Sequence, residues 1–256
     1  MGLSLLLTND DGYQAPGLKA LREELAKQHK LTVIAPDRER SGSSAALTLG
    51  SPLKINKHEE GVYSVAGTPA DCAHLAFRHF MNDLPDLVVS GINRGPNLGD
   101  DTLFSGTVGA ANVASLEGLP AIAVSMGDFG EPMNYATAAV VVAKLIQKLD
   151  LQCRSLRGKV LNINVPNVAY DDLKGVRQTR LARRYYPRHF DPDRENPDDH
   201  LWYGRGDVSH DELPDSDATA IDEGYVSLCM LSPHLLDNES FPNGLKKEFF
   251  HGVLDS

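Results

Sequence analysis

The stretch "LSLLLTNDDGYQAPGLKALREELAKQ", residues 3–28, contains the unit from which the fold can be predicted. Residues 3–8 form a short apolar run, which is typical of a strand that is covered on both faces of a sheet. Leucines recur at helical spacing within 16–28, and Pro16 suits the first turn of a helix. The sequence therefore predicts a buried strand, a polar loop and an amphipathic helix in direct succession.

The same alternation of strand-like and helix-like segments continues along the chain. Residues 52–66 alternate in polarity around Gly61, which suggests a hairpin. Further strands are expected at 31–37, 85–93, 120–126, 159–166 and 223–233, and further helices at 68–81, 105–118 and 134–149. This order predicts an α/β fold with a Rossmann-like, mainly parallel sheet and helices on both of its faces.

The domain organisation is expected to be one α/β domain over residues 1–256, with its core in about 1–177 and 217–232. The segment 178–216 is rich in charge, Pro and Tyr, and 233–256 would be a C-terminal tail. Either 178–216 is a surface loop, or it is a projecting C-terminal arm or hairpin used in oligomerisation. Aromatic residues that would help such an arm pack on another subunit are Tyr185, Tyr186, Trp202 and Tyr203.

Composition narrows the range of partners. The formal net charge is -10, which argues against nucleic acid polymers and anionic membranes as partners. Cys72, Cys153 and Cys229 are too few and too scattered for a disulfide framework or a zinc site. No leader-like start or apolar run of about 20 residues is present, so a cytoplasmic protein is expected.

Asp10 and Asp11 lie side by side at the end of the first predicted strand, although like charges repel and resist burial. One alternative is that one carboxylate caps the next helix while the other faces solvent. However, loops after the other strands supply more oxygen donors: Ser41, Ser43, Ser44, Asn93, Asn97, Asp100 and Asp101. Because the carboxyl ends of parallel strands share one edge, these loops could converge there. An oxygen-only donor set predicts a hard divalent cation, Mg²⁺, Mn²⁺ or Ca²⁺.

Ser105, Gly106 and Thr107 precede a helix of small residues, where free N–H groups and the helix dipole favour an anion. Simple N-capping by Ser105 is the alternative. Beside a metal, phosphate is the natural ligand. No P-loop, G-x-S-x-G or HExxH motif occurs, and the missing GxGxxG argues against an NAD-linked oxidoreductase.

Together, the motifs "TNDDGYQAPG", "APDRERSGSS", "GTPADC", "VSGINRGPNLGDDTLFSGTVGAA" and "DEGYVSL" resemble those of the SurE family of nucleotidases. The resemblance runs in order from residue 5 to about residue 231. It implies a metal-dependent phosphomonoesterase that acts on nucleoside 5'- and 3'-monophosphates, and it extends to cleavage of short polyphosphate. It also implies a homodimer or homotetramer.

The resemblance carries residue roles onto matching positions. It implies one divalent cation per subunit, Mg²⁺ or Mn²⁺, with Ca²⁺ an option in a crystal. The implied metal ligands are Asp10, Asp11, Ser41 and Asn93. The implied phosphate- or substrate-binding residues are Asn9, Asn97, Ser105, Gly106 and Thr107.

We hypothesise that water bound to this metal, held by Asp10 and Asp11, attacks the phosphate without any side-chain nucleophile. Asn97, Ser105 and Thr107 would orient the phosphate for in-line attack. The sequence identifies no general acid for the leaving alcohol. The alternative is a non-catalytic nucleotide-binding α/β module whose acids hold ribose hydroxyls.

Overall fold

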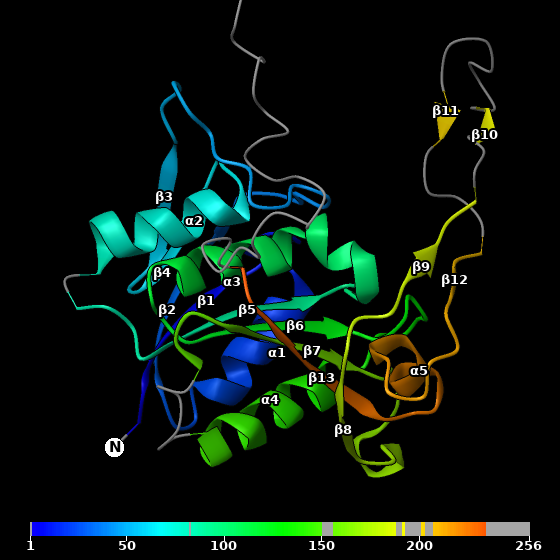
Figure 1. Cartoon of the computed structure of the whole chain (residues 1–256). Helices are drawn as coiled ribbons and strands as arrows, with labels where there is room; N and C mark the ends of the chain where they lie inside the picture. The colour runs from blue at the N-terminus through cyan, green and yellow to red at the C-terminus, as the bar shows by residue number, and fades with distance from the viewer. Residues whose placement is uncertain are drawn as a thin grey trace, which may run out of the picture.

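The computed structural model describes residues 2–81, 83–149, 156–187, 191–192, 201–202 and 207–233. Its centre is a nine-stranded sheet with the order β3-β4-β2-β1-β5-β6-β7-β13-β8 (Figure 1). The strands are β1 (Ser4–Thr8), β2 (Lys30–Pro36), β3 (Ile55–Glu59), β4 (Val62–Val65), β5 (Leu87–Asn93), β6 (Ala121–Met126), β7 (Val160–Val165), β8 (Val176–Thr179) and β13 (Val226–Leu231). The run from β4 to β7 is parallel throughout, which confirms the predicted Rossmann-like sheet.

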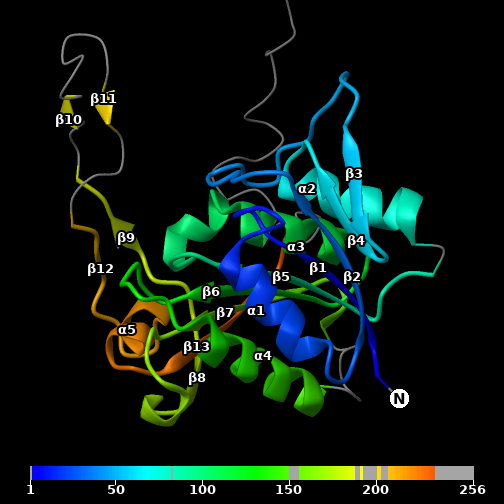
Figure 2. The ribbon, with the colours of Figure 1, turned by 180° about the vertical axis from the view of Figure 1, so that it is seen from behind.

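Helices cover both faces of this sheet, as the alternation predicted (Figures 1 and 2). On one face α1 (Pro16–Leu25) and α4 (Tyr135–Leu149) share a core with Leu5 and Leu7. On the other face α2 (Pro69–Leu75) and α3 (Gly106–Leu116) share a core with Leu6. Successive side chains of a strand point to opposite faces, so the apolar run of β1 serves both cores.

Several boundaries differ from the predictions. The helix expected at 16–28 ends at Leu25, and the helix expected at 68–81 continues after α2 as a π-helix, Ala76–Phe80. A 3₁₀ helix, Gly99–Leu103, precedes α3, and another spans Tyr170–Asp172. The strand expected at 223–233 is shorter in the structure, as β13.

Two elements near the C-terminal part of the core were not predicted. Helix α5 (Asp217–Asp222) packs against β13, β7 and β8, and β8 pairs parallel with β13. β13 itself runs antiparallel to β7, so the sheet ends in reversed strands on this side. At the other edge β3 and β4 form the antiparallel hairpin that was predicted around Gly61.

The segment 178–216 contains two short antiparallel pairs in its described part. β9 (Arg184–Tyr185) pairs with β12 (Ser209–His210), and β10 (Asp191–Pro192) pairs with β11 (Leu201–Trp202). Both pairs lie beyond the edge of the large sheet in the two views (Figures 1 and 2). The role of this segment as an oligomerisation arm stays a prediction. Tyr203 and the tail residues 234–256 lie outside the described residues.

Other sequence-based expectations concern cysteines and membranes. Cys72 and Cys229 are free and buried, whereas Cys153 lies outside the described residues. Among the helices of the described ranges, each is too short or too polar to cross a lipid bilayer.

Asp71 joins the start of α2 to a distant loop. Its carboxylate accepts hydrogen bonds from Thr48 N (2.9 Å), Thr48 Oγ1 (2.6 Å) and Thr68 N (2.8 Å). Thr68 Oγ1 in turn accepts from Asp71 N, which completes a capping box. Burial raises the pKa of Asp71, but these hydrogen bonds outweigh it and hold the pKa below its ordinary 3.8.

We expect Asp71→Asn to lower the free energy of unfolding by about 1–2 kcal/mol at pH 7, because it removes a charge-assisted cap. The folded-state pKa is lowered, so this stabilisation is present above the unfolded pKa and is lost as the pH falls through the folded value. Urea unfolding at pH 7 and near pH 3 tests this, with exposed Asp172→Asn as the control. An equal gap between wild type and variant at both pH values would contradict the role of the charge.

Candidate metal and phosphate site

The carboxyl ends of β1, β2 and β5 lead into loops that line one cavity of about 1250 Å³. The predicted site residues that line it are Asp10, Ser41, Asn93, Asn97 and Ser105. These residues come from three loops, those that follow β1, β2 and β5, as the parallel-strand rule predicts for residues at this edge.

Asp10 lies at the centre of the predicted site. It is only 3% exposed, and Thr107 Oγ1 donates a hydrogen bond to its Oδ1. Thr107 Oγ1 also lies 3.4 Å from Asn93 Oδ1, and Asn93 Nδ2 donates to Gly95 O (2.8 Å). The amide of Asn93 is therefore oriented with its oxygen toward Thr107, whose hydroxyl also bonds Asp10, and this oxygen is the atom that a metal would bind.

Asp11 is the second carboxylate of the pair, and its Oδ2 accepts from Arg94 N (3.1 Å). Burial and the neighbouring Asp10 raise the pKa of Asp11 to about 6, against the lowering effect of the Arg94 N–H. Burial also raises the pKa of Asp10, although the Thr107 hydrogen bond opposes it. Both carboxyl groups are thus costly to ionise in the protein alone.

The guanidinium groups of the neighbouring loops do not offset the burial of this pair, although the charge of Arg94 lowers the pKa of Asp11. Arg40 pairs with Asp37 (3.8 Å), and Arg94 pairs with Glu131 (2.9 Å). Two partly or fully buried carboxylates without an ion-pair partner among the described residues fit a divalent cation. Such an ion would need neutral oxygen ligands too, because nowhere in the described ranges do three His, Cys, Asp or Glu side chains form a metal-binding group.

Ser41 differs from the other predicted ligands. It lines the same cavity, but it is exposed and its Oγ donates to Glu39 Oε1 (2.9 Å). The loop that carries it is tied to Asp10, because Arg40 N donates to Asp10 O (2.7 Å). Its role as a ligand stays a prediction; the bond to Glu39 uses the hydroxyl hydrogen and leaves the oxygen lone pairs for an ion.

The first turn of α3 approaches Asp10 very closely. A Cβ added to Gly106 would lie 2.8 Å from Asp10 Cβ and 2.7 Å from Ser43 Oγ, so a side chain would not fit. Ser105 caps the helix by accepting from Val108 N (3.1 Å), as the alternative reading expected. The cap uses the N–H of Val108, and the backbone N–H of Thr107 bonds the Asp10 carboxylate. The hydroxyl hydrogen of Ser105 and the N–H of Gly106 are left as donors for an anion.

Asn9 shapes the turn that presents the two acids. It is fully buried, and its Nδ2 donates to Gly12 O (2.9 Å). Its Oδ1 is buried without a hydrogen-bond partner. Gly12 has a φ of 103°, which a residue with a side chain rarely adopts. The contribution of Asn9 to substrate binding stays a prediction.

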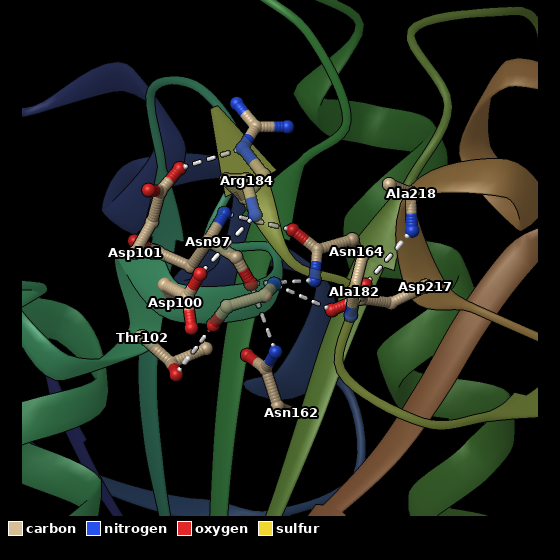
Figure 3. Close-up of polar contacts among 11 residues, drawn as sticks. Asn97, Asp100, Asp101, Thr102, Asn162, Asn164, Ala182, Arg184, Asp217 and Ala218 are labelled. Atoms are coloured by element: carbon tan, nitrogen blue, oxygen red, sulfur yellow. Dashed lines mark hydrogen bonds and ion pairs between the residues drawn. The ribbon is translucent and has the colours of Figure 1, made fainter. Parts of the chain in front are cut away.

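Asn97 is held by a polar network that the sequence analysis missed (Figure 3). Asn164 Oδ1 accepts from Asn97 N (2.9 Å), and Asn162 and Asn164 both donate to Asn97 O (2.9 and 3.0 Å). Asn97 Nδ2 donates to Ser125 Oγ (2.8 Å). The available signal was the pair of asparagines two residues apart in "VLNINV", which places two amides on one face of a buried strand.

Asp217, at the start of α5, fixes the same loop from the opposite side. Its side chain is 0% exposed and accepts from Gly99 N, Ala182 N and Ala218 N, each at 2.9 Å (Figure 3). Arg184 adds a second tie, because its Nε lies 3.1 Å from Asp101 Oδ2. The loop between Asn93 and Ser105 is therefore held at its middle by the bonds of Asn97 and Gly99, and at its ends by those of Asn93 and Ser105.

The comparisons with known proteins identify the family of this chain. The family model described as survival protein SurE matches residues 5–188. The 5'-nucleotidase SurE of Idiomarina loihiensis is 48% identical over 232 residues, which span 90% of this chain and 92% of that protein. The 5'-nucleotidase SurE of Coxiella burnetii is 46% identical over 244 residues, with 93% and 92% covered.

A crystal structure of the SurE protein from Aquifex aeolicus superimposes with a TM-score of 0.77 and 33% identity, covering 98% of each chain. The match to the family model and the identity to curated relatives both extend over most of the chain. This protein is a member of the SurE family.

Proposed function

We propose that this protein is a metal-dependent 5'-nucleotidase, which hydrolyses nucleoside monophosphates to nucleoside and phosphate. The observation that carries the proposal is the pairing of Asp10 and Asp11 next to the first turn of α3, with no ion pair to either carboxylate in the described part of the chain. The names of the relatives from Idiomarina and Coxiella support the same activity. The non-catalytic nucleotide-binding module is not favoured, because those relatives are enzymes by name.

Four side chains would hold the cation: Asp10, Asp11, Asn93 and Ser41. Thr107 keeps Asp10 in place through its hydroxyl, and Gly95 orients the Asn93 amide through its carbonyl. When bound, a divalent cation supplies Lewis acidity that stabilises negative charge on the phosphoryl oxygens. Mg²⁺ and Mn²⁺ are the proposed ions, because both prefer oxygen ligands.

The phosphate would bind at the start of α3. Ser105 can donate its hydroxyl hydrogen, and the N–H of Gly106 at the start of the helix is a further donor. The missing side chain at Gly106 lets phosphate oxygens come near the carboxylates of the metal site. Asn97, fixed by Asn162 and Asn164, would complete the orientation of the phosphate for in-line attack.

We extend the proposal to nucleoside 3'-monophosphates and short polyphosphate, and to assembly as a homodimer or homotetramer. Both extensions rest on the sequence motifs shared with the family. In this assembly the segment 178–216 would contact a second subunit, consistent with the exposed aromatic rings of Tyr185 and Trp202.

The activity can be tested by phosphate release. We expect the protein to release inorganic phosphate from AMP in the presence of Mn²⁺ or Mg²⁺, to lose this activity in EDTA, and to regain it when excess metal is added. The reason is that the two carboxylates cannot hold the phosphoryl charge without a cation. AMP binding in Mn²⁺ without any phosphate release would instead select the nucleotide-binding module.

A further inference from the structure

Phe129 is a large apolar side chain that lies exposed at the edge of the site. It follows β6, is 68% exposed, and lines the same cavity as Asp10, Asn93 and Ser105. An aromatic ring that is exposed to water gains no hydrophobic stabilisation until something covers it.

The ring is nevertheless held firmly. A Cβ added to Gly95 would lie 2.0 Å from Phe129 Cε1, so the ring rests directly on the backbone of the loop that carries Asn93. The loop of Phe129 is itself bonded, because Gly127 N donates to Val165 O (2.7 Å) and Asn167 Nδ2 donates to Gly130 O (2.9 Å). The exposure of the ring therefore does not come from an unattached loop.

A second contact joins the loop of Phe129 to the loop that carries Asn93. Arg94, which follows Asn93, pairs with Glu131 in the loop of Phe129 (2.9 Å). Gly95 O accepts from Asn93 Nδ2, so the backbone under the ring also orients a predicted metal ligand. Gly95 therefore contacts both the ring of Phe129 and the side chain of Asn93, a predicted metal ligand.

We propose that Phe129 is the stacking platform for the nucleobase of the substrate. This proposal rests on the proposed nucleotidase function. With the phosphate at the start of α3 and the cation at Asp10 and Asn93, the rest of a nucleotide must lie along the cavity, and Phe129 offers it a flat apolar face. Stacking on an aromatic ring is worth about 1–3 kcal/mol per base and tolerates any base.

A second exposed phenylalanine lines the same cavity and could stack on the base instead. Phe104 is 65% exposed, lines the same cavity and directly precedes Ser105. Phe104 N donates to Asp101 O, and Phe104 O accepts from Ser44 N. Among the glycines of the described residues, Gly95 lies against the ring of Phe129, whereas none has the Phe104 ring among its nearest atoms. Phe104→Ala is therefore the control for Phe129→Ala.

The experiment compares two substrates, AMP and glycerol 2-phosphate, which has a phosphate but no ring. We expect Phe129→Ala to lower kcat/KM for AMP by roughly 5- to 150-fold, the factor that 1–3 kcal/mol corresponds to, and to change that for glycerol 2-phosphate less than about twofold. Phe129→Trp should keep kcat/KM for AMP near the wild-type value, because it keeps an aromatic face for stacking. Phe104→Ala should leave the ratio between the two substrates unchanged.

Three outcomes would overturn the assignment: no change for AMP, an equal loss for both substrates, or a loss confined to Phe104→Ala. Failure of the nucleotidase function is distinguishable, because the wild type would then release no phosphate from either substrate. In that case the stacking role of Phe129 is tested by measuring the binding of AMP in Mn²⁺ by calorimetry. Weaker AMP binding in Phe129→Ala would support the platform, and unchanged binding would reject it.

Discussion

Asp11→Asn is expected to lower metal-dependent phosphate release from AMP by at least about 10³-fold, because several kcal/mol of charge stabilisation is lost with the cation. The variant keeps the shape of the side chain and can still accept from Arg94 N. It removes one of the two adjacent charges that would hold the ion. Asp10→Asn should have the same effect, although it also disturbs the Thr107 hydrogen bond.

Stability measurements separate this effect from misfolding. Burial and Asp10 raise the pKa of Asp11 to about 6, so ionised Asp11 opposes folding when no metal is bound. Because the folded-state pKa of Asp11 is raised, the wild type has its full stability below pH 3.8, where Asp11 is neutral in both states. The free energy of unfolding then falls as the pH rises through about 6, where folded Asp11 ionises. At pH 7 we therefore expect metal-free Asp11→Asn to be at least as stable as the wild type.

Mn²⁺ should then raise the Tm of the wild type and of Asp172→Asn, an exposed control, but not the Tm of Asp11→Asn. Full turnover by Asp11→Asn after EDTA treatment and return of Mn²⁺ would falsify the metal role of this carboxylate. A loss of Tm in the metal-free variant would instead point to a structural role.

The convergence of Asp10 and Asn93 could be predicted from local patterns alone. Apolar runs fixed the strands, and parallel strands necessarily place their carboxyl ends at one edge. The polar residues that follow β1 and β5 were therefore bound to meet, whatever the details of the helices between them. The same reasoning found the start of α3, because Ser105 and the glycine after it mark a helix N-terminus.

The support of the site could not be predicted in this way. Asn162 and Asn164 lie in a strand that is otherwise apolar, so the sequence pattern around them predicts only a buried strand. Their role is to bond Asn97, which lies about 65 residues earlier in the chain. Asp217 depends on Gly99, 118 positions away. Such partners become visible only when the fold brings them together, since a buried polar group is explained by its hydrogen bonds and not by its neighbours in sequence.

The C-terminal part of the core shows the same limit. Helix α5 is a short element, and β8 has only four residues, so neither carries a long periodic signal. Both are stabilised by their contacts with β13 and not by their own propensity. The sequence therefore indicated no helix at Asp217–Asp222 and no strand at Val176–Thr179, although α5 lies within the range 217–232 that was expected to belong to the core.

Asp217→Ala is expected to lower the free energy of unfolding by about 3–5 kcal/mol, because it leaves buried N–H groups without acceptors. Those groups belong to Gly99, Ala182 and Ala218, and the carboxylate is fully buried. Asp217→Asn should cost less, about 1–3 kcal/mol, because its oxygen can still serve the pair at Oδ1 while its amide opposes Gly99 N–H. A free energy of unfolding that increases from Asp217→Ala to Asp217→Asn to wild type would show that this side chain acts as a hydrogen-bond acceptor.

Urea unfolding measures this order, with Asp215→Asn as the control, since its exposed ion pair to Arg180 contributes at most about 1 kcal/mol. Under conditions where Asp217→Asn stays folded, kcat/KM should fall by the same factor for AMP and for glycerol 2-phosphate. The carboxylate holds the loop of Asn97 and Ser105, which any phosphate ester must use, whereas Phe129 acts on the base alone. A loss restricted to AMP in this variant would show that α5 acts on the nucleoside side of the cavity, and an unchanged stability would show that Gly99 finds another acceptor.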